Sequence, residues 1–471
     1  MFDYDLLVIG AGSGGLAAAE RAATYGARVA IAERSKPGGA CVNYGCIPEK
    51  LLDYAASFNR LERVATSYGW QECRREFDWS RFVSAEVQHI QHLNELHRQH
   101  LQDAGVQLIH GHAHFLDAHT VQIDQHSVTA ERMLIAVGAK PSKPDIPGIE
   151  HTMTWHELYY LPEQPKTVAV IGGDPIGVKI AGSLKALGSE VTQVIAEERL
   201  LSELDAELSL QIQERLLKMG VQILPKATVS QIEKDGSELC LTLSKSAESK
   251  SAESKSAESK SAKSGSEESR SVKSLKLDSV LVDATRQPNL SGLNLKSVGV
   301  QRTELGAIWV DERSCTTQPH IFAIGDCTER IPLTPSAIAQ GRIFSDTEFG
   351  GKPRTVQLDW VPMSLSSHPE AATVGMSETQ ARETFGDAVV CYRTQFQPLL
   401  YCLTGWNEKT FMKVIVNQQD SERVLGIHVV GDGAVDMIQS LAVALKLGLT
   451  KPDLDTAIGI HPSSAEELFS I

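Results

Sequence analysis

One cysteine-containing segment indicates both the fold and the chemistry of this chain: Gly38-Gly39-Ala40-Cys41-Val42-Asn43-Tyr44-Gly45-Cys46-Ile47-Pro48-Glu49-Lys50. Cys41 and Cys46 are five positions apart, and the glycines leave the backbone free to bend or to approach a ligand closely. Pro48 suits the first turn of a following helix, whose dipole lowers the pKa of a nearby thiol. The segment therefore predicts a redox pair, with a zinc half-site or two buried cysteines as alternatives; no second ligand pair at zinc-finger spacing follows.

A dinucleotide-binding pattern precedes this segment. An apolar run at 6–9 predicts a buried parallel strand, and a helical pattern at 16–25 leads to a second strand at 28–32. Between them lie the glycines of Gly10-Ala11-Gly12-Ser13-Gly14-Gly15, which let a pyrophosphate approach the helix N-terminus. Glu33, 23 residues after Gly10, is placed to accept hydrogen bonds from a ribose. The pattern predicts a bound dinucleotide, and the alternative is a tight strand–helix turn without a ligand.

A second unit of the same kind begins at residue 167. An apolar strand is followed by Gly172-Gly173-Asp174-Pro175-Ile176-Gly177, in which Asp174 replaces a motif glycine. We expect its carboxylate to bring negative charge into the space of a pyrophosphate. The next strand, 190–195, ends without an acid for a ribose and without an arginine cluster for a 2′-phosphate. The sequence therefore predicts a Rossmann unit with impaired nucleotide chemistry.

Length and composition limit the remaining possibilities. A chain of 471 residues is expected to form three or four domains, and no apolar run is long enough for a membrane span. The net charge of −14 argues against nucleic acid or anionic membrane as partners. The N-terminus has no basic region typical of a signal peptide, so we expect a cytoplasmic protein. Residues 51–105 are expected to be mostly helical, and their histidines lack the pairing of a metal site.

A repetitive tract covers residues 244–274. It repeats Ser-Lys-Ser-Ala-Glu with a period of five, and Val272 is its one large apolar residue. Such a composition cannot offset the entropy of ordering, which predicts an inert disordered insertion rather than a binding segment. The tract interrupts an expected β-hairpin between 239–243 and 275–277.

The C-terminal third carries three further motifs. A buried strand at 321–324 ends in Gly325-Asp326, and Leu333-Thr334-Pro335 precedes a helical pattern. Strands at 411–416 and 424–430 and a helix at 436–447 are expected in the last 120 residues. His461 lies five residues before Glu466 across a Pro-Ser turn, which is typical of an oriented general acid/base.

Together these motifs resemble the flavoprotein disulfide reductases, and among them the glutathione reductases. The resemblance implies an α/β fold with two Rossmann-like nucleotide-binding domains and a C-terminal α+β dimerisation domain. The implied division is an FAD-binding part at 1–148, an NAD(P)-binding-like domain at 149–285, a second FAD-binding or central part at 286–350 and an interface domain at 351–471.

The resemblance also implies roles for individual residues. Cys46 is the implied flavin-facing thiol, Cys41 the interchange thiol, and His461, oriented by Glu466, the acid/base supplied by the partner subunit of a homodimer. The implied FAD-binding residues are Gly10, Gly12, Ser13, Gly14, Gly15, Glu33, Ala40, Cys41, Lys50, Ala113, Gly138, Asp326 and Thr334, with Lys50 also implied in catalysis. NADPH or NADH would contact Gly172, Gly173 and Ile176, and glutathione disulfide or a related small-molecule disulfide would contact Arg342 and His97.

Several positions depart from the family pattern. Asp174, Ala196, Glu197, Ser202 and Thr285 stand where nucleotide-binding residues are expected, which predicts weak use of NADPH and of NADH. The alternatives are therefore a flavin-bound thiol oxidase, a non-catalytic flavin-binding protein or a lipoamide dehydrogenase-like enzyme.

On the substrate side, Glu20 and His97 replace an arginine and a tyrosine of the family. Near the flavin, Glu49 and Lys179 show reversed signs, which predicts a swapped ion pair. In the alternative, Lys50 alone serves the flavin and the other two are unrelated surface charges.

Overall fold

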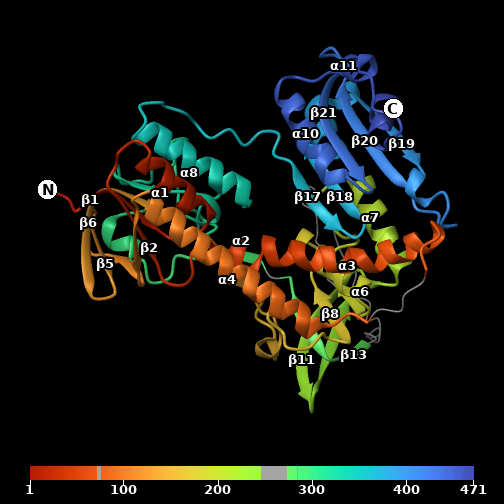
Figure 1. Ribbon diagram of the computed structural model, residues 1–471, viewed down its shortest axis with the longest axis horizontal. Coiled ribbons are helices and arrows are strands. Elements are labelled where there is room, and N and C mark those ends of the chain that lie inside the picture. The colour runs from red at the N-terminus through yellow and green to blue at the C-terminus, as the bar shows by residue number, and fades with distance from the viewer. Residues whose placement is uncertain (72–75, 246–272, 284) are drawn as a thin grey trace, which may run out of the picture.

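The computed structural model describes residues 1–71, 76–245, 273–283 and 285–471, which form five sheets with their covering helices (Figure 1). The first sheet is parallel and is built from short, apolar, β-branched segments with both faces covered. In spatial order its parallel strands are β3 (Gln107–His110), β2 (Val29–Glu33), β1 (Tyr4–Ile9), β6 (His126–Ile135) and β16 (Ile321–Ala323). β5 (Thr120–Ile123) and β4 (Ala113–Phe115) continue antiparallel from the first half of β6.

Helices cover one face of this sheet. They are α1 (Ser13–Ala23), α4 (Trp79–Asp103) and α8 (Thr334–Glu348). The backbones of α1 and α8 approach closely, because a Cβ on Gly341 would lie 2.4 Å from the carbonyl oxygen of Gly14. This contact places α8, which follows the last strand of this sheet, directly on α1.

The second sheet repeats the parallel plan. Its strands, in spatial order, are β10 (Gln222–Leu224), β9 (Glu190–Val194), β8 (Thr167–Ile171) and β14 (Ser279–Val282). The helices α6 (Pro175–Ala186) and α7 (Ala206–Met219) belong to this unit. A two-stranded link of β7 (Ala139–Ser142) and β15 (Thr285–Pro288) connects it to the first.

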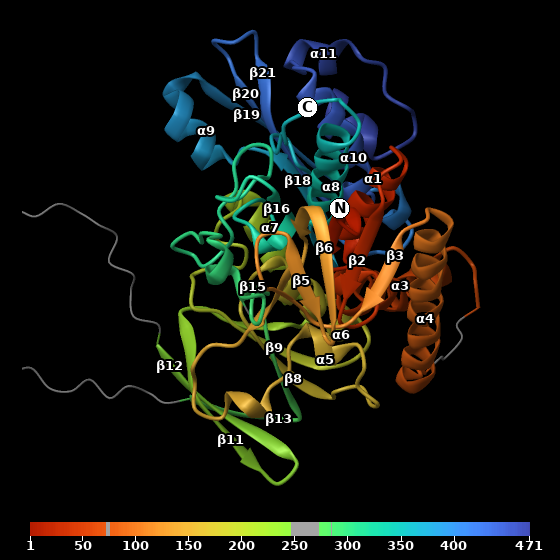
Figure 2. The same cartoon turned by 90° about the vertical axis from the view of Figure 1, so that its left-hand side faces the viewer.

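An antiparallel sheet extends from this unit, seen at the lower edge of Figure 2. It consists of β11 (Ala227–Asp235), β12 (Glu238–Lys245) and β13 (Lys273–Leu277). Leu241 pairs with Leu275, which confirms the expected hairpin. Residues 246–272 of the repetitive tract lie outside the described residues. The predicted limits of the tract are wrong at both ends, because Ser244 and Ser274 belong to paired strands, where the ladder supplies backbone hydrogen bonds even to polar residues.

The C-terminal part is a five-stranded antiparallel sheet. Its strands, in spatial order, are β17 (Met363–Ser367), β18 (Glu370–Gly375), β21 (Arg423–Val430), β20 (Thr410–Asn417) and β19 (Val389–Phe396). The accompanying helices are α9 (Glu378–Phe385), α10 (Ala434–Lys446) and α11 (Lys451–Thr456). The expected strands and helix of this region are confirmed.

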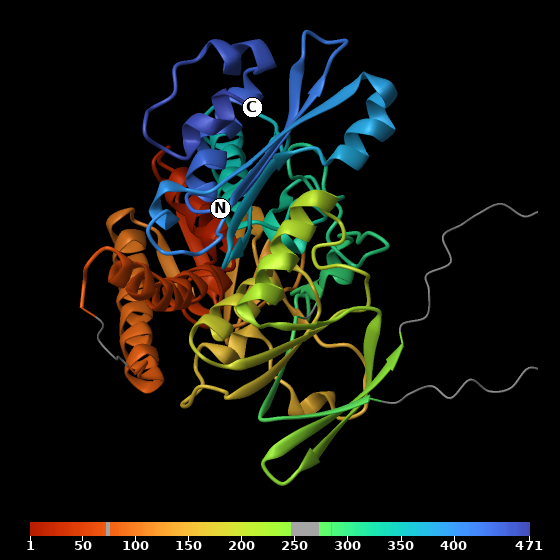
Figure 3. The same ribbon diagram turned by 90° about the vertical axis from the view of Figure 1, so that its right-hand side faces the viewer.

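The contact between α7 and this sheet contains a buried ion pair, and Figure 3 shows α7 beside the sheet. Lys413 on β20 lies 2.9 Å from Asp205, the N-cap of α7, and both side chains are 1% exposed.

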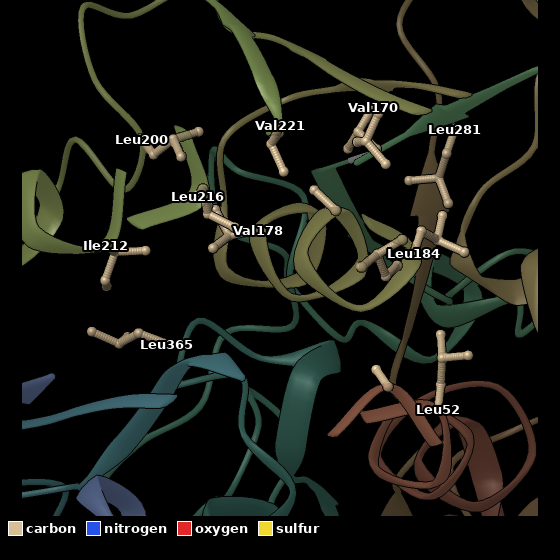
Figure 4. Close-up of a cluster of buried hydrophobic side chains, with 14 of the residues drawn as sticks. Leu52, Val170, Val178, Leu184, Leu200, Ile212, Leu216, Val221, Leu281 and Leu365 are labelled. Atoms are coloured by element: carbon tan, nitrogen blue, oxygen red, sulfur yellow. The ribbon is translucent and has the colours of Figure 1, made fainter. Parts of the chain in front are cut away.

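One apolar core joins all three units. Figure 4 shows Leu52 of the first unit facing Leu184 of α6, while Leu365 of β17 lies beside Ile212 of α7 in the same cluster. Leu52 belongs to α3 (Cys46–Ser67), which follows the short α2 (Gly39–Tyr44). α3 therefore packs against the second Rossmann unit directly after the cysteines, and α5 (Trp155–Leu158) completes the described α-helices. None of the helices in the described ranges has the length and apolar character needed to cross a membrane.

Candidate active site

The cysteine segment lies on the first glycine turn. Gly38 and Gly39 have φ values of +105° and +63°, which favour glycine, and Gly38 forms a β-bridge with Gly12. A Cβ on Gly39 would lie 2.6 Å from the Cα of Gly12, so the two turns can meet only because Gly39 lacks a side chain. This contact places α2 beside the N-terminus of α1.

The two thiols lie at consecutive helix starts. Cys41 is in the first turn of α2, Cys46 is the first residue of α3, and neither forms a disulfide in the described chain. A hydrogen bond from the Cys41 thiol lowers the pKa of Cys46 to about 6, and the same bond raises the pKa of Cys41. The Thr334 hydroxyl, 3.4 Å from the Cys46 Sγ, also favours the thiolate. Cys46 is therefore the thiol that carries negative charge.

A cavity of about 470 Å³ extends from the glycine turn to the start of α8. Eleven of the predicted FAD-binding residues line it: Gly10, Gly12, Ser13, Gly14, Glu33, Ala40, Cys41, Ala113, Gly138, Asp326 and Thr334. Gly15 does not line the cavity. A Cβ there would lie 2.0 Å from the carbonyl oxygen of Gly10, so this glycine allows the helix to pack on the strand.

The cavity also contains cations that the sequence did not single out, Arg34, Lys36 and Lys140. They lie in loops and in a short strand outside any recognisable motif, so their presence at the cavity follows from the sheet topology. We therefore missed them.

The carboxylates in this cavity suit a dinucleotide with a ribose and a ribityl chain. Glu33 accepts hydrogen bonds from the backbone N–H groups of Ala11 and Ser35, both at 2.8 Å, which fixes the carboxylate at the end of β2. Burial raises the pKa of Asp326, whose carboxylate has Arg286 3.3 Å away. A carboxylate that has lost part of its hydration is stabilised by hydroxyl groups that donate hydrogen bonds to it. The ribose and the ribityl chain of FAD carry such hydroxyl groups, so Glu33 and Asp326 fit FAD.

The charge pair near the cysteines is reversed, as predicted. The Lys179 Nζ on α6 lies 3.0 Å from the Glu49 Oε1 on α3, with the two side chains 15% and 21% exposed. Lys50 instead lies 2.5 Å from Asp53 and over the ring of Tyr54, and it does not line the cavity. Adjacent helix residues diverge by about 100°, so Lys50 faces away from the contact that Glu49 makes.

His461 and Glu466 form the expected pair. The His461 Nδ1 lies 3.0 Å from both Glu466 carboxylate oxygens, and the His461 side chain is 80% exposed. Figure 1 shows the C-terminal end of the chain well separated from α2. Among the described residues, His461 forms no hydrogen bond or ion pair with Cys41 or Cys46.

The predicted substrate residues lie on three helices. Arg342 of α8 and His100 of α4 stabilise the charge on Glu20 of α1, while burial raises the pKa of this carboxyl. His97 of α4 is half-buried, and burial lowers its pKa. Glu20 and Arg342 therefore belong to one charged cluster, and the structure gives no direct contact between His97 and Arg342.

The second Rossmann unit has its glycine turn in place but unfavourable charge around it. Gly172 and Gly173 follow β8, and Ile176 is in the first turn of α6. Partial loss of hydration, with Glu197 and Glu203 nearby, raises the pKa of Asp174.

The positions after β9 offer little positive charge to a 2′-phosphate. Ala196 and Glu197 lie in the loop, and the Arg199 guanidinium donates a hydrogen bond to the carbonyl oxygen of Ser202. Thr285 begins β15, where it pairs with Ser142. The predicted departures from the family pattern therefore all lie around this second glycine turn or on β15.

Two Rossmann-like sheets, an apposed cysteine pair and a large cavity at the glycine turn of the first sheet define a dinucleotide-dependent disulfide oxidoreductase. Family comparison agrees, because residues 4–341 match "Pyridine nucleotide-disulphide oxidoreductase" and residues 361–470 match the dimerisation domain of the same family. The chain belongs to the pyridine nucleotide-disulphide oxidoreductases.

Full-length relatives are similar to this chain from end to end. A glutathione reductase of Nostoc sp. is 41% identical over 100% of this chain and 99% of its own length. A glutathione reductase of Burkholderia cepacia is 36% identical, with 100% and 98% covered. A chloroplastic/mitochondrial glutathione reductase of Pisum sativum is 34% identical, with 100% and 82% covered.

These comparisons confirm the predicted fold class, the resemblance to glutathione reductases and the class of enzyme. They also support FAD and a pyridine nucleotide as its cofactors and a homodimer as its assembly.

Proposed function

We propose that this protein is a glutathione-disulfide reductase in which Cys41 and Cys46 carry the reducing equivalents. The observation that supports this most directly is the low pKa of Cys46 at the start of α3, beside a cavity that fits FAD. The full-length similarity to glutathione reductases supports the choice of substrate.

The thiol chemistry follows from the two helix starts. FAD, when bound, supplies the two-electron link between the pyridine nucleotide and the cysteine pair. Cys41 then gives its proton to His461, and its sulfur attacks one sulfur of the substrate, which forms a mixed disulfide and releases one thiolate. Cys46 attacks the Cys41 Sγ next, which releases the second thiol and leaves a Cys41–Cys46 disulfide.

Each leaving thiolate needs a proton, and His461 is the proposed donor. Glu466 accepts a hydrogen bond from the His461 Nδ1 and orients the imidazole ring. Because His461 contacts neither cysteine of its own chain, it would act on the cysteines of the other subunit in the homodimer.

The proposed division of the chain follows the sheets. The first parallel sheet would be the FAD-binding domain, from 1–148 and 286–350, and the second the NAD(P)-binding-like domain, 149–285. The antiparallel sheet would lie in the interface domain, 351–471, which contains the match to a dimerisation domain. We also propose a cytoplasmic location, where the cysteines would be kept reduced.

Absorbance spectroscopy of purified protein tests this function. We expect flavin absorbance, a long-wavelength thiolate–flavin band after two-electron reduction, and release of thiol from glutathione disulfide. Cys46→Ser should abolish the band and the thiol release, whereas Cys402→Ser, at an exposed cysteine elsewhere, should change neither. A protein that binds no flavin, or that shows no band, would contradict the proposal.

A second candidate is a flavin-bound thiol oxidase that uses NAD(P)H poorly. The carboxylates of the second Rossmann unit favour it. Stopped-flow reduction of the flavin by NADPH and by NADH separates the two candidates, because rapid reduction at micromolar NADPH would exclude the oxidase.

A further inference from the structure

A carboxylate of the protein itself occupies the start of α6. Asp283 follows β14 directly, and its Oδ2 accepts hydrogen bonds from the backbone N–H groups of Gly177, at 2.9 Å, and Asp174, at 3.1 Å. These groups lie at the N-terminus of a helix of 12 residues. An aspartate therefore uses the donors that the helix start would offer to an anion.

The glycines of the motif make room for this side chain. A Cβ on Gly177 would lie 2.4 Å from the Asp283 Oδ2, and a Cβ on Gly172, whose φ is +121°, would lie 2.8 Å from the Asp283 Cβ. The space that these glycines leave open next to the turn is filled by Asp283.

In a Rossmann unit, the same turn and helix start bind the pyrophosphate of a dinucleotide. We propose that Asp283 competes with this pyrophosphate, so that a pyridine nucleotide binds the second unit only when the Asp283 carboxylate is displaced or neutralised. This inference rests on the proposed function, because it concerns the nucleotide site of that enzyme, and it names the residue that limits the affinity of the site.

The charges around Asp283 determine when it is neutral. Burial and, next in size, the neighbouring Asp174 carboxylate raise the pKa of Asp283 to about 7, while Arg286 on β15 opposes the shift. Glu197 and Glu203, from the loop after β9, add negative charge through Asp174. Asp283 is therefore protonated on the acid side of neutrality, where it repels a pyrophosphate least, and nucleotide affinity should fall as the pH rises through 7.

ADP-ribose is the suitable probe, because it carries the pyrophosphate but cannot transfer a hydride. Its binding to the FAD-loaded protein is measured by calorimetry at pH 6 and pH 8. For the unchanged protein we expect affinity to weaken by about tenfold over this range, because one proton is linked to binding. For Asp283→Asn, which keeps an oxygen that can accept the two N–H bonds, we expect binding at least about tenfold tighter at pH 8 and no dependence on pH. Asp283→Ala should behave in the same way.

Asp278→Asn is the matched control. Asp278 precedes the same strand and accepts a hydrogen bond from the Thr167 backbone N–H at the opposite end of the sheet, so its loss removes the same charge away from the turn. Its ADP-ribose affinity should equal that of the unchanged protein at both pH values. Equal affinities for the unchanged protein and Asp283→Asn at pH 8 would overturn the proposal.

The test is independent of the catalytic assignment. Dithionite-reduced protein and glutathione disulfide report on the cysteines without any pyridine nucleotide. Failure of that reaction would contradict the proposed function, whereas unchanged ADP-ribose binding in Asp283→Asn would contradict only this inference.

Discussion

The Glu86 carboxyl group, on α4, is buried without a partner. Its side chain is 2% exposed, and neither oxygen accepts a hydrogen bond from the described residues. Burial raises the pKa of this group to about 8. A carboxyl group in such a place stays protonated at neutral pH, because the charged form would lose its hydration.

We expect Glu86 to make the protein less stable as the pH rises. In the unfolded chain the group ionises at its ordinary pKa of 4.5 and in the folded chain at about 8, so the folded state loses stability between these two values. Glu86→Gln removes the titration, and its melting temperature should exceed that of the unchanged protein by more at pH 8 than at pH 5. The difference in free energy at pH 8 should be on the order of 3 kcal/mol.

Glu95→Gln, at an exposed position of the same helix, is the control and should show no such divergence. Parallel melting curves for Glu86→Gln and the unchanged protein across this pH range would mean that Glu86 is solvated.

At the scale of elements, α3 and α6 are joined by Glu49 and Lys179. The pair is partly buried and lies at the helix start that carries Cys46, so the ion pair orients both helices around the thiol. The Glu49 carboxylate also opposes the negative charge on Cys46.

A double-mutant cycle with Glu49→Gln and Lys179→Met measures this contact. We expect a coupling free energy of about 1–2 kcal/mol, which is more than an exposed pair gives because the two side chains are largely shielded from solvent. Thermal or denaturant unfolding of the FAD-loaded protein provides the measurement. The exposed Glu214–Lys218 pair of α7 is the matched control, with expected coupling below about 0.5 kcal/mol. Additive effects at Glu49 and Lys179 would show that the contact contributes nothing.

At the scale of the whole molecule, the C-terminal sheet unit leaves apolar residues exposed beside His461. Ile458 and Ile460 are 97% and 81% exposed, and the match to a dimerisation domain covers both. Such a patch is covered in an oligomer, which would carry His461 to the second subunit.

Ile460→Asp should therefore weaken the homodimer. A charge in an apolar interface loses its hydration without gaining a partner, so we expect a monomer at micromolar concentration in light scattering. Flavin content should be retained, because the cavity lies in the first unit, and release of thiol from glutathione disulfide should be lost. Leu305→Asp, at a residue that is 82% exposed outside the dimerisation region, should remain dimeric. A dimeric and active Ile460→Asp protein would contradict this arrangement.

The sequence alone determined the elements whose chemistry depends on close spacing. The two glycine turns, the Cys41–Cys46 segment and the His461–Glu466 pair each lie within a few residues, so their backbone geometry is fixed locally. The sequence also determined the class of fold, because strand, turn, helix and strand recur twice in the same order.

The tertiary structure decided which distant residues meet. Asp283 reaches the turn at Gly172 only because β14 lies beside β8, and the Glu49–Lys179 contact exists only because α3 packs on α6. Lys50 pairs with Asp53, because its helix presents the preceding residue, Glu49, to α6; its role at the flavin stays a prediction. The burial of Glu86 likewise depends on how α4 packs against the rest of the molecule. Contacts between residues more than a hundred positions apart, and the pKa values that follow from them, depend on the packing of sheets and helices and carry no local signal in the sequence.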